Sequence, residues 1–139
     1  MAAAPIEYSE MVQEHFRNPR NNGAFPTGTP QVLEGRAGER RQGREISLEL
    51  QLDEEGRVMG CRYRVYGCPA TVALCSVLSE RLKGRQVAEI REIGGLALAE
   101  ELGLPPAKRA AALLLEDALQ AALARYNMTT RRQDRKSVV

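Results

Sequence analysis

The chain has 139 residues, 43% of them hydrophobic, which is enough for one compact domain and too few for two ordinary ones. Its charges nearly cancel, leaving a net charge of +2, so nothing indicates nucleic acid binding. Three cysteines without close pairs do not form a secreted disulfide framework, and no apolar run approaches the length of a membrane span. Residues 1–5 are too short for a signal peptide, so we expect a cytoplasmic protein with no membrane insertion.

The first predicted element is an amphipathic helix over residues 7–16, in which apolar residues recur at helical spacing. It must end before Pro19, because a proline pushes the residue before it out of the helical conformation. His15 lies on this helix, and we interpret it as the polar edge of the amphipathic surface. With one histidine, the chain offers no nucleophile–histidine–acid set for hydrolase chemistry.

Three strands follow in the prediction: a short one near residues 31–34, a half-buried one over 45–52, and a return strand after the turn at 53–56. Residues that should face the core on the last two strands are Ile46, Leu48, Leu50, Leu52, Met59, Cys61, Tyr63 and Val65. Arg62 and Arg64 alternate with the second group and should point away from the core.

Helices are predicted over residues 69–83, 87–92, 96–102 and 107–126. The positions of the first helix expected to face the sheet are Val72, Cys75, Leu78 and Leu82. The last helix carries a stripe of small and aliphatic side chains, formed by Ala110, Leu113, Leu114, Asp117, Ala118 and Ala121. The fold class is therefore α+β, a small antiparallel sheet of about three strands with one face covered by helices. We expect a single domain over residues 1–128 and a basic, disordered tail over 129–139.

The three cysteines, Cys61, Cys68 and Cys75, are spaced by seven residues but cannot converge on one metal. The first pair can be about 20 Å apart along a strand, and the second is separated by about 10 Å of helix rise. Metal–sulfur bonds are only about 2.3 Å long. We therefore predict that Cys61 and Cys75 pack in the core.

Cys68 differs, because it lies where a strand passes into a helix and where the helix dipole favours a thiolate. A nearby cation such as Arg44 should lower its pKa further. An accessible thiolate is a nucleophile and a ligand for soft metals. A cysteine that only fills the turn is equally consistent with this position.

Residues 35–44 are rich in glycine and arginine, with Arg36, Arg40, Arg41 and Arg44, and are expected to form a mobile basic loop. Such a loop could bind a carboxylate, a phosphate or an acidic protein surface. The alternative, an ordinary solvated loop, is the more common outcome for a charged run. The segment lacks the signature of a phosphate-binding loop.

Three separated segments of the chain, in the right order, resemble the IscU/NifU family of iron–sulfur cluster scaffolds, and the similarity covers about residues 6–127. The segments are the stretch from Tyr8 to Gly23, the stretch from Gln42 to Cys68 with its Tyr66-Gly67-Cys68 turn, and Leu104-Pro105-Pro106-Ala107-Lys108 followed by Glu116-Asp117-Ala118. The resemblance implies a non-enzymatic protein that docks a cysteine desulfurase and, through residues 104–108, an Hsp70-type chaperone system.

The positions where that family places metal ligands hold other residues here, namely Gln42, Arg44, Ala110 and Ala111, and only Cys68 is retained. A [2Fe–2S] cluster requires four ligands, and an arginine offers none. The resemblance therefore implies a degenerate member with no complete metal site and no stably bound cofactor. Iron or a [2Fe–2S] cluster would be held only transiently and with external ligands.

Three hypotheses follow. The first is a pseudo-scaffold that keeps the docking surfaces of the family and accepts sulfur on Cys68. The second is a structural or regulatory binding subunit, without cluster or sulfur chemistry, that docks its basic loop onto an acidic protein partner. The third and weakest is a cluster shared across a homodimer, with Cys68 from each chain and two external thiols.

Overall fold

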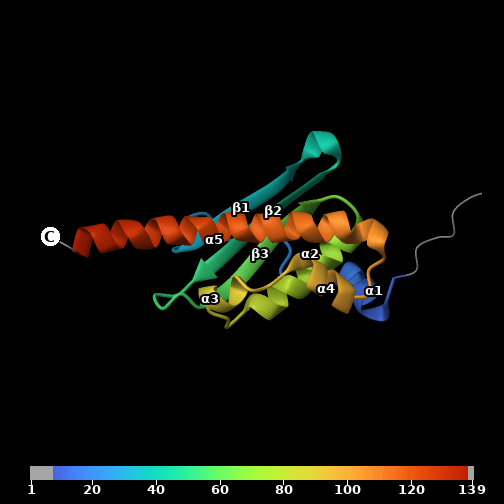
Figure 1. Cartoon of the computed structure of the whole chain (residues 1–139), viewed down its shortest axis with the longest axis horizontal. Helices are drawn as coiled ribbons and strands as arrows, with labels where there is room; N and C mark the ends of the chain where they lie inside the picture. The colour runs from blue at the N-terminus through green and yellow to red at the C-terminus, as the bar shows by residue number, and fades with distance from the viewer. Residues whose placement is uncertain (1–7, 138–139) are drawn as a thin grey trace, which may run out of the picture.

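The computed structural model describes the backbone of residues 8–137 and the side chains of residues 8–126. Three strands form one antiparallel sheet in the order β1-β2-β3, and the long helix α5 crosses one face of it (Figure 1). The predicted α+β fold is confirmed. The helices and strands, in chain order, are α1 Glu10–Arg17, β1 Val32–Glu39, β2 Arg44–Leu52, β3 Val58–Tyr66, α2 Pro69–Leu82, α3 Val87–Ile90, α4 Gly95–Glu101 and α5 Arg109–Ser137.

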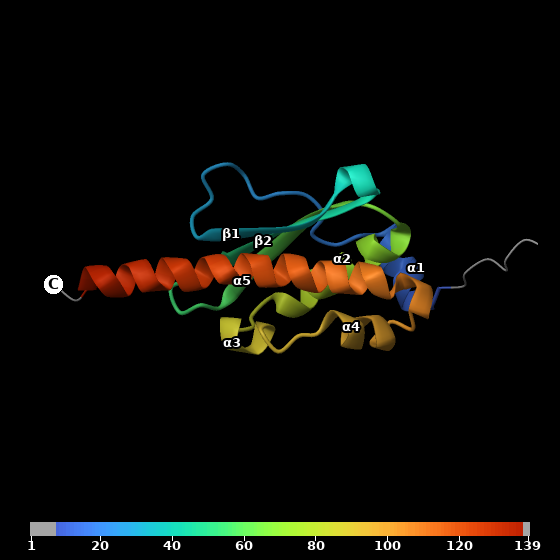
Figure 2. The ribbon, with the colours of Figure 1, turned by 45° about the horizontal axis from the view of Figure 1, so that its top comes forward.

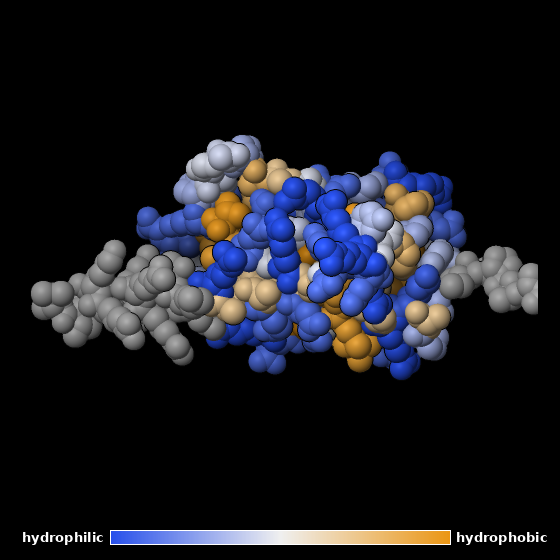
Figure 3. All heavy atoms as spheres, turned by 90° about the horizontal axis from the view of Figure 1, so that it is seen from above, coloured by the Kyte–Doolittle hydropathy of each residue, from blue (hydrophilic) through white to orange (hydrophobic). Residues whose placement is uncertain are grey.

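The core lies between the sheet and the helices. The alternation predicted for β2 is confirmed, since Ile46, Leu48 and Leu50 are 0% exposed and Leu52 is 3% exposed. Helix α5 runs along β1 and β2, while α2 lies against β3 (Figures 1 and 2). Figure 3 shows one side of the molecule, on which hydrophilic residues dominate and hydrophobic ones form small separate patches. Within the described residues, no helix is both long and apolar enough to cross a membrane.

The prediction that Met59 faces the core is wrong, because β3 contains a bulge. Gln51 pairs with Gly60 and Leu52 pairs with Val58, which leaves Met59 as an extra residue between the two pairs. A bulge reverses the side on which the following residues point. Val58 is therefore buried, and Met59 is 53% exposed.

The expectation of a mobile loop over residues 35–44 is also wrong. β1 continues to Glu39, a 3-10 turn spans Arg40–Gln42, and β2 begins at Arg44. The glycine at position 35 serves close packing, because a Cβ atom there would lie 2.1 Å from the backbone oxygen of Ala118 in α5. Gly35 therefore reflects contact with a helix, and the segment forms a β-hairpin.

Helix α5 differs from its prediction in both phase and length. Of the six residues in the stripe named from the sequence, only Ala118 is buried, and Leu113 is 44% exposed. Apolar residues of α5 lie on several sides of the helix, so the sequence pattern does not determine which side faces the core. The buried positions are Ala111, Ala112, Leu115, Ala118, Leu119, Ala122 and Leu123.

The same helix continues to Ser137, beyond the predicted end at residue 126. The added segment contains no glycine or proline and is rich in good helix formers, so nothing in it ends the helix. The division into a domain over residues 1–128 and a tail stays a prediction.

The remaining helices lie close to their predicted positions. The predicted start of α1 at residue 7 lies outside the described residues, and α1 begins after Ser9, whose hydroxyl accepts a hydrogen bond from the backbone N–H of Val12 at 3.3 Å. Helix α2 starts at Pro69 as expected, but Val72 is only partly buried and does not belong to the core. The short helices α3 and α4 begin at Val87 and Gly95.

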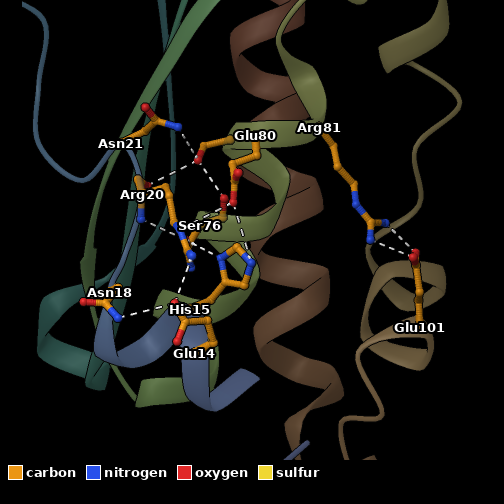
Figure 4. A network of polar contacts seen from close by, with 10 residues as sticks. Glu14, His15, Asn18, Arg20, Asn21, Ser76, Glu80, Arg81 and Glu101 are labelled. Carbon is orange, nitrogen blue, oxygen red and sulfur yellow. Dashed lines mark hydrogen bonds and ion pairs between the residues drawn. The ribbon is translucent and has the colours of Figure 1, made fainter. Parts of the chain in front are cut away.

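His15 is more buried than a polar helix edge, since its side chain is 12% exposed. Its Nδ1 lies 2.7 Å from Oγ of Ser76 and its Nε2 lies 3.6 Å from Glu80, both on α2 (Figure 4). A serine, a histidine and a carboxylate therefore meet at this point, and hydrolase chemistry would require access to the serine oxygen. Ser76 is 0% exposed, and its hydroxyl also accepts a hydrogen bond from the backbone N–H of Arg20. No substrate can reach this oxygen, so the set joins α1 to α2.

Candidate functional site

Cys68 occupies the N-cap position of α2, two residues after the last residue of β3. Its side chain is partly exposed, and its sulfur lies 3.4 Å from the hydroxyl oxygen of Thr71 in the first turn of the helix. Pro69 occupies the first helical position, where a missing N–H has no cost. The thiol of Cys68 therefore lies at the N-terminal end of a helix, as the sequence indicates.

The surroundings of Cys68 favour its thiolate. Partial burial by itself raises the pKa of the thiol, but hydrogen bonds from the side chain and backbone of Thr71 oppose this effect. The positive charge of Lys108 and the backbone N–H of Ala70 lower the pKa further, and the net result is a pKa below the ordinary cysteine value. A thiol in this state is more reactive at neutral pH.

Cys61 and Cys75 have the opposite environment. Their exposed fractions are 1% and 0%, and both belong to the hydrophobic core, which confirms the prediction that they pack there. Burial raises the pKa of Cys61 to about 12 and also raises the pKa of Cys75. Within the described part of the chain, no three histidine, cysteine or acidic residues gather in a way that could hold a metal ion.

Lys108 reaches the cysteine from a distant part of the chain. It ends the 3-10 turn Pro106–Lys108 that leads into α5, within the segment predicted to bind a chaperone. The sequence pointed to Arg44 as the cation near Cys68; Arg44 does lie beside the turn, 3.9 Å from where a Cβ atom on Gly67 would be. The cation that lowers the cysteine pKa is instead Lys108.

Thr71 was missed by the sequence analysis. The sequence does contain an indication of its role. Thr71 lies three positions after Cys68, and a side chain at that spacing can contact the residue at the N-cap position of a helix. Its hydroxyl belongs to the same helical turn as the thiol and lies within hydrogen-bond distance of it.

The four arginines predicted to dock a partner are divided by the hairpin. Arg36 and Arg40 line a hollow on the face of the sheet that α5 does not cover, together with Arg64 of β3. Arg41 lies in the 3-10 turn at the tip of the hairpin, and Arg44 begins β2 beside the cysteine turn. Of the four, only Arg36 and Arg40 therefore line the same hollow.

The other predicted ligand positions offer little to a metal. Gln42 lies in the 3-10 turn of the hairpin, Ala110 is exposed, and Ala111 is 7% exposed in the first turn of α5. Alanine has no donor atom and arginine is cationic, so these residues do not fit a resident iron–sulfur cluster.

The amino-acid sequence is similar to that of known cluster scaffolds. The family described as NifU-like N terminal domain matches residues 7–133. The iron-sulfur cluster assembly scaffold protein IscU of Escherichia coli K12 is 38% identical over 121 residues, which cover 87% of this chain and 94% of that protein. Iron-sulfur cluster assembly protein 2 of Arabidopsis thaliana is 37% identical over 119 residues, 86% of this chain and 73% of that protein. The name of the first relative describes a scaffold, in agreement with the expectation of a non-enzymatic protein.

Solved structures share the fold at low sequence identity. A SUF-system scaffold protein described as putative, from Fervidobacterium islandicum, superposes with a TM-score of 0.62 at 19% identity, covering 84% of this chain and 96% of that one. The N-terminal part of a NifU-like protein from Brucella abortus gives 0.62 at 18% identity, covering 84% and 91%. These likenesses support the fold, and the sequence matches establish the family. The chain belongs to the NifU-like N-terminal domain family of iron–sulfur cluster scaffolds.

Proposed function

We propose that this protein is a cytoplasmic, scaffold-like component of iron–sulfur cluster biogenesis that accepts sulfur on Cys68 and lacks a complete ligand set of its own. The observation that carries the proposal is the setting of this thiol, which is partly exposed, contacts Thr71 and has a lowered pKa. The kinship with proteins named cluster assembly scaffolds supports the biological context.

The sulfur donor would be a cysteine desulfurase carrying a persulfide. The thiolate of Cys68 attacks the terminal sulfur of that persulfide, a new S–S bond forms on Cys68, and the old S–S bond breaks. The donor cysteine leaves as a thiolate, so the transfer needs no external oxidant or reductant. The positive charge of Lys108 favours the attacking thiolate.

A chaperone is the second proposed partner. Residues Leu104–Lys108 connect α4 to α5, and Pro106 and Ala107 in the middle of this segment are exposed. An Hsp70-type chaperone system would bind them from solvent. Iron or a [2Fe–2S] cluster would be cargo, held with ligands from a second protein or from small thiols, because the chain supplies only one accessible thiol in the described region.

Sulfur loading tests the proposal. The protein is incubated with a cysteine desulfurase and cysteine, and intact-mass spectrometry measures the addition of one sulfur atom. We expect loading of the wild type and none of Cys68→Ser, in which Cys61 and Cys75 remain as internal controls. Lys108→Gln should load more slowly at neutral pH and recover at higher pH. Equal loading of Cys68→Ser would refute the role of this cysteine.

A second candidate function is a structural or regulatory binding subunit without sulfur chemistry. It is favoured by the exposure of the hairpin arginines, since the side chains of Arg36 and Arg40 are 62% and 72% exposed. In this case, the triple charge reversal Arg40→Glu, Arg41→Glu and Arg44→Glu weakens binding to an acidic partner, whereas Cys68→Ser has no effect on binding. Pull-down of the complex from the source cell, followed by quantitative mass spectrometry of both variants, separates the two candidates.

A further inference from the structure

The open face of the sheet carries a row of three cross-strand neighbours. Arg36 of β1 pairs with Ser47 of β2, and Ser47 pairs with Arg64 of β3. Adjacent strands lie about 4.8 Å apart, so the two arginines stand about 10 Å apart on either side of the serine. Two guanidinium groups at this separation can both approach one anion placed above the serine.

This row lies within a hollow of about 270 Å³. Ser47 is its floor, with an exposed fraction of only 6%, and the arginines stand around it. The guanidinium carbon of Arg40 lies 5.6 Å from the centre of the Tyr66 ring, a cation–π contact that orients this third arginine. The lining residues are Arg36, Arg40, Glu45, Ser47, Arg64, Val65 and Tyr66.

Beside the hollow, Arg36 and Ser47 already bind one carboxylate of the chain itself, that of Glu34. Nε of Arg36 donates a hydrogen bond of 2.6 Å to Glu34, and the hydroxyl of Ser47 donates one of 3.4 Å to the same oxygen. The hydrogen bond from Arg36 is the main cause of a lowered pKa of Glu34. The chemistry of this surface is therefore suited to carboxylates.

The charges around the hollow favour the binding of one additional carboxylate. Glu34 offsets Arg36, and Glu45 offsets Arg40 only weakly, since their closest N···O distance is 3.9 Å. Among the described residues, Arg64 has no ion pair or hydrogen bond, and it acts on Glu34 only through its charge. Three guanidinium groups against two carboxylates leave one net positive charge, which matches a single carboxylate better than a doubly charged phosphate.

We propose that this hollow, the open-face arginine site, binds a carboxylate side chain from an acidic segment of a partner protein. The proposal rests on the proposed function only in that the protein docks partners, and sulfur transfer at Cys68 is independent of it. Arg64 would make the main contact through its planar, two-pronged guanidinium group, and Arg40 would flank it.

The test uses a fluorescein-labelled ten-residue peptide of alternating glutamate and glycine, with binding followed by fluorescence anisotropy in low and physiological salt. We expect Arg64→Gln to weaken binding by about tenfold. Arg64→Lys keeps the charge but not the planar fork, and should fall between Arg64→Gln and the wild type. The matched control is Arg17→Gln on α1, which removes the same charge and whose side chain contacts Gln13 within its own helix; it should bind like the wild type.

Three outcomes would overturn the proposal. These are no binding of the peptide to the wild type in low salt, an equal loss with Arg17→Gln, and displacement of the peptide by inorganic phosphate at a lower concentration than by acetate. The last would identify a phosphate site. Peptide binding measured on Cys68→Ser separates the two hypotheses, because Cys68 does not line the hollow; this variant should lose sulfur loading and bind the peptide like the wild type.

Discussion

Two neighbouring rows of the same sheet behave in opposite ways. The row of Gly35, Leu48 and Tyr63 faces the helices, and the row beside it, Arg36, Ser47 and Arg64, faces away from them. In the first row, Leu48 and Tyr63 are at most 1% exposed, whereas both arginines of the second row are exposed. Residues one position apart along the three strands therefore point to opposite faces of the sheet. One face is defined by close packing and the other by charged side chains.

The difference has a physical origin. On the helix face, stability comes from apolar area removed from water and from backbones that approach closely, so small changes of volume are costly. On the open face, exposed charges interact through water and contribute little to stability. That face is therefore free to carry a recognition function, and the substitutions below test this separation.

The largest effect is expected for Gly35→Ala. The added Cβ atom would lie 2.1 Å from the backbone oxygen of Ala118, so β1 and α5 must move apart. We expect a loss of about 4 kcal/mol in the free energy of unfolding, measured with urea. The control is Gly60→Ala in β3, whose new Cβ atom would make an ordinary 3.4 Å contact with Phe25. Similar losses in both variants would contradict the importance of the close approach.

Leu48→Ala tests burial on the same row without a backbone clash. Leu48 is fully buried, and its truncation should cost about 3 kcal/mol of unfolding free energy. Gln51→Ala, on the open face of the same strand, should cost about 0.5 kcal/mol or less. If the glutamine variant lost as much stability as the leucine variant, the two faces would not differ as described.

We expect the free energy of unfolding to depend on pH through His15, which joins α1 to α2 by polar contacts. Burial and the nearby Arg20 lower the pKa of His15 below its usual value, so protonation favours the unfolded chain. The stability that depends on the neutral ring is present above about pH 6.5 and is lost as the pH falls toward the lowered pKa.

The measurement for His15 is urea unfolding at pH 7.5 and pH 5.0, for the wild type and for His15→Asn. Asparagine keeps an acceptor for the hydroxyl of Ser76 but does not titrate. The wild type should lose more stability than the variant between the two pH values. Equal losses would mean that His15 does not contribute to the pH dependence.

The smallest effect on stability is expected for Arg64→Gln. Its side chain is exposed and forms no ion pair within the described residues, so the free energy of unfolding should change by at most about 0.5 kcal/mol. Peptide binding should fall at the same time. A large loss of stability would show that this arginine supports the fold, and the separation between the two faces would fail.

Much of the architecture could be predicted from local patterns. The alternation in residues 45–52, Pro69 at the start of α2 and the strand-to-helix position of Cys68 each reflect short-range rules of backbone geometry. The bulge at Met59 and the phase of α5 could not be predicted in this way. Both depend on which partner each segment packs against, which the sequence of the segment alone does not contain.

The candidate sites also combine features that the sequence predicts with features that only the tertiary structure shows. The sequence by itself determined the family, the order of the elements, the burial of Cys61 and Cys75 and the special position of Cys68. Only the tertiary structure placed Lys108 near that thiol and Arg64 in the same hollow as Arg36, because these residues are far apart along the chain. A short-range pattern specifies a helix or a strand, whereas the charges around a thiol or an anion depend on how distant segments pack together.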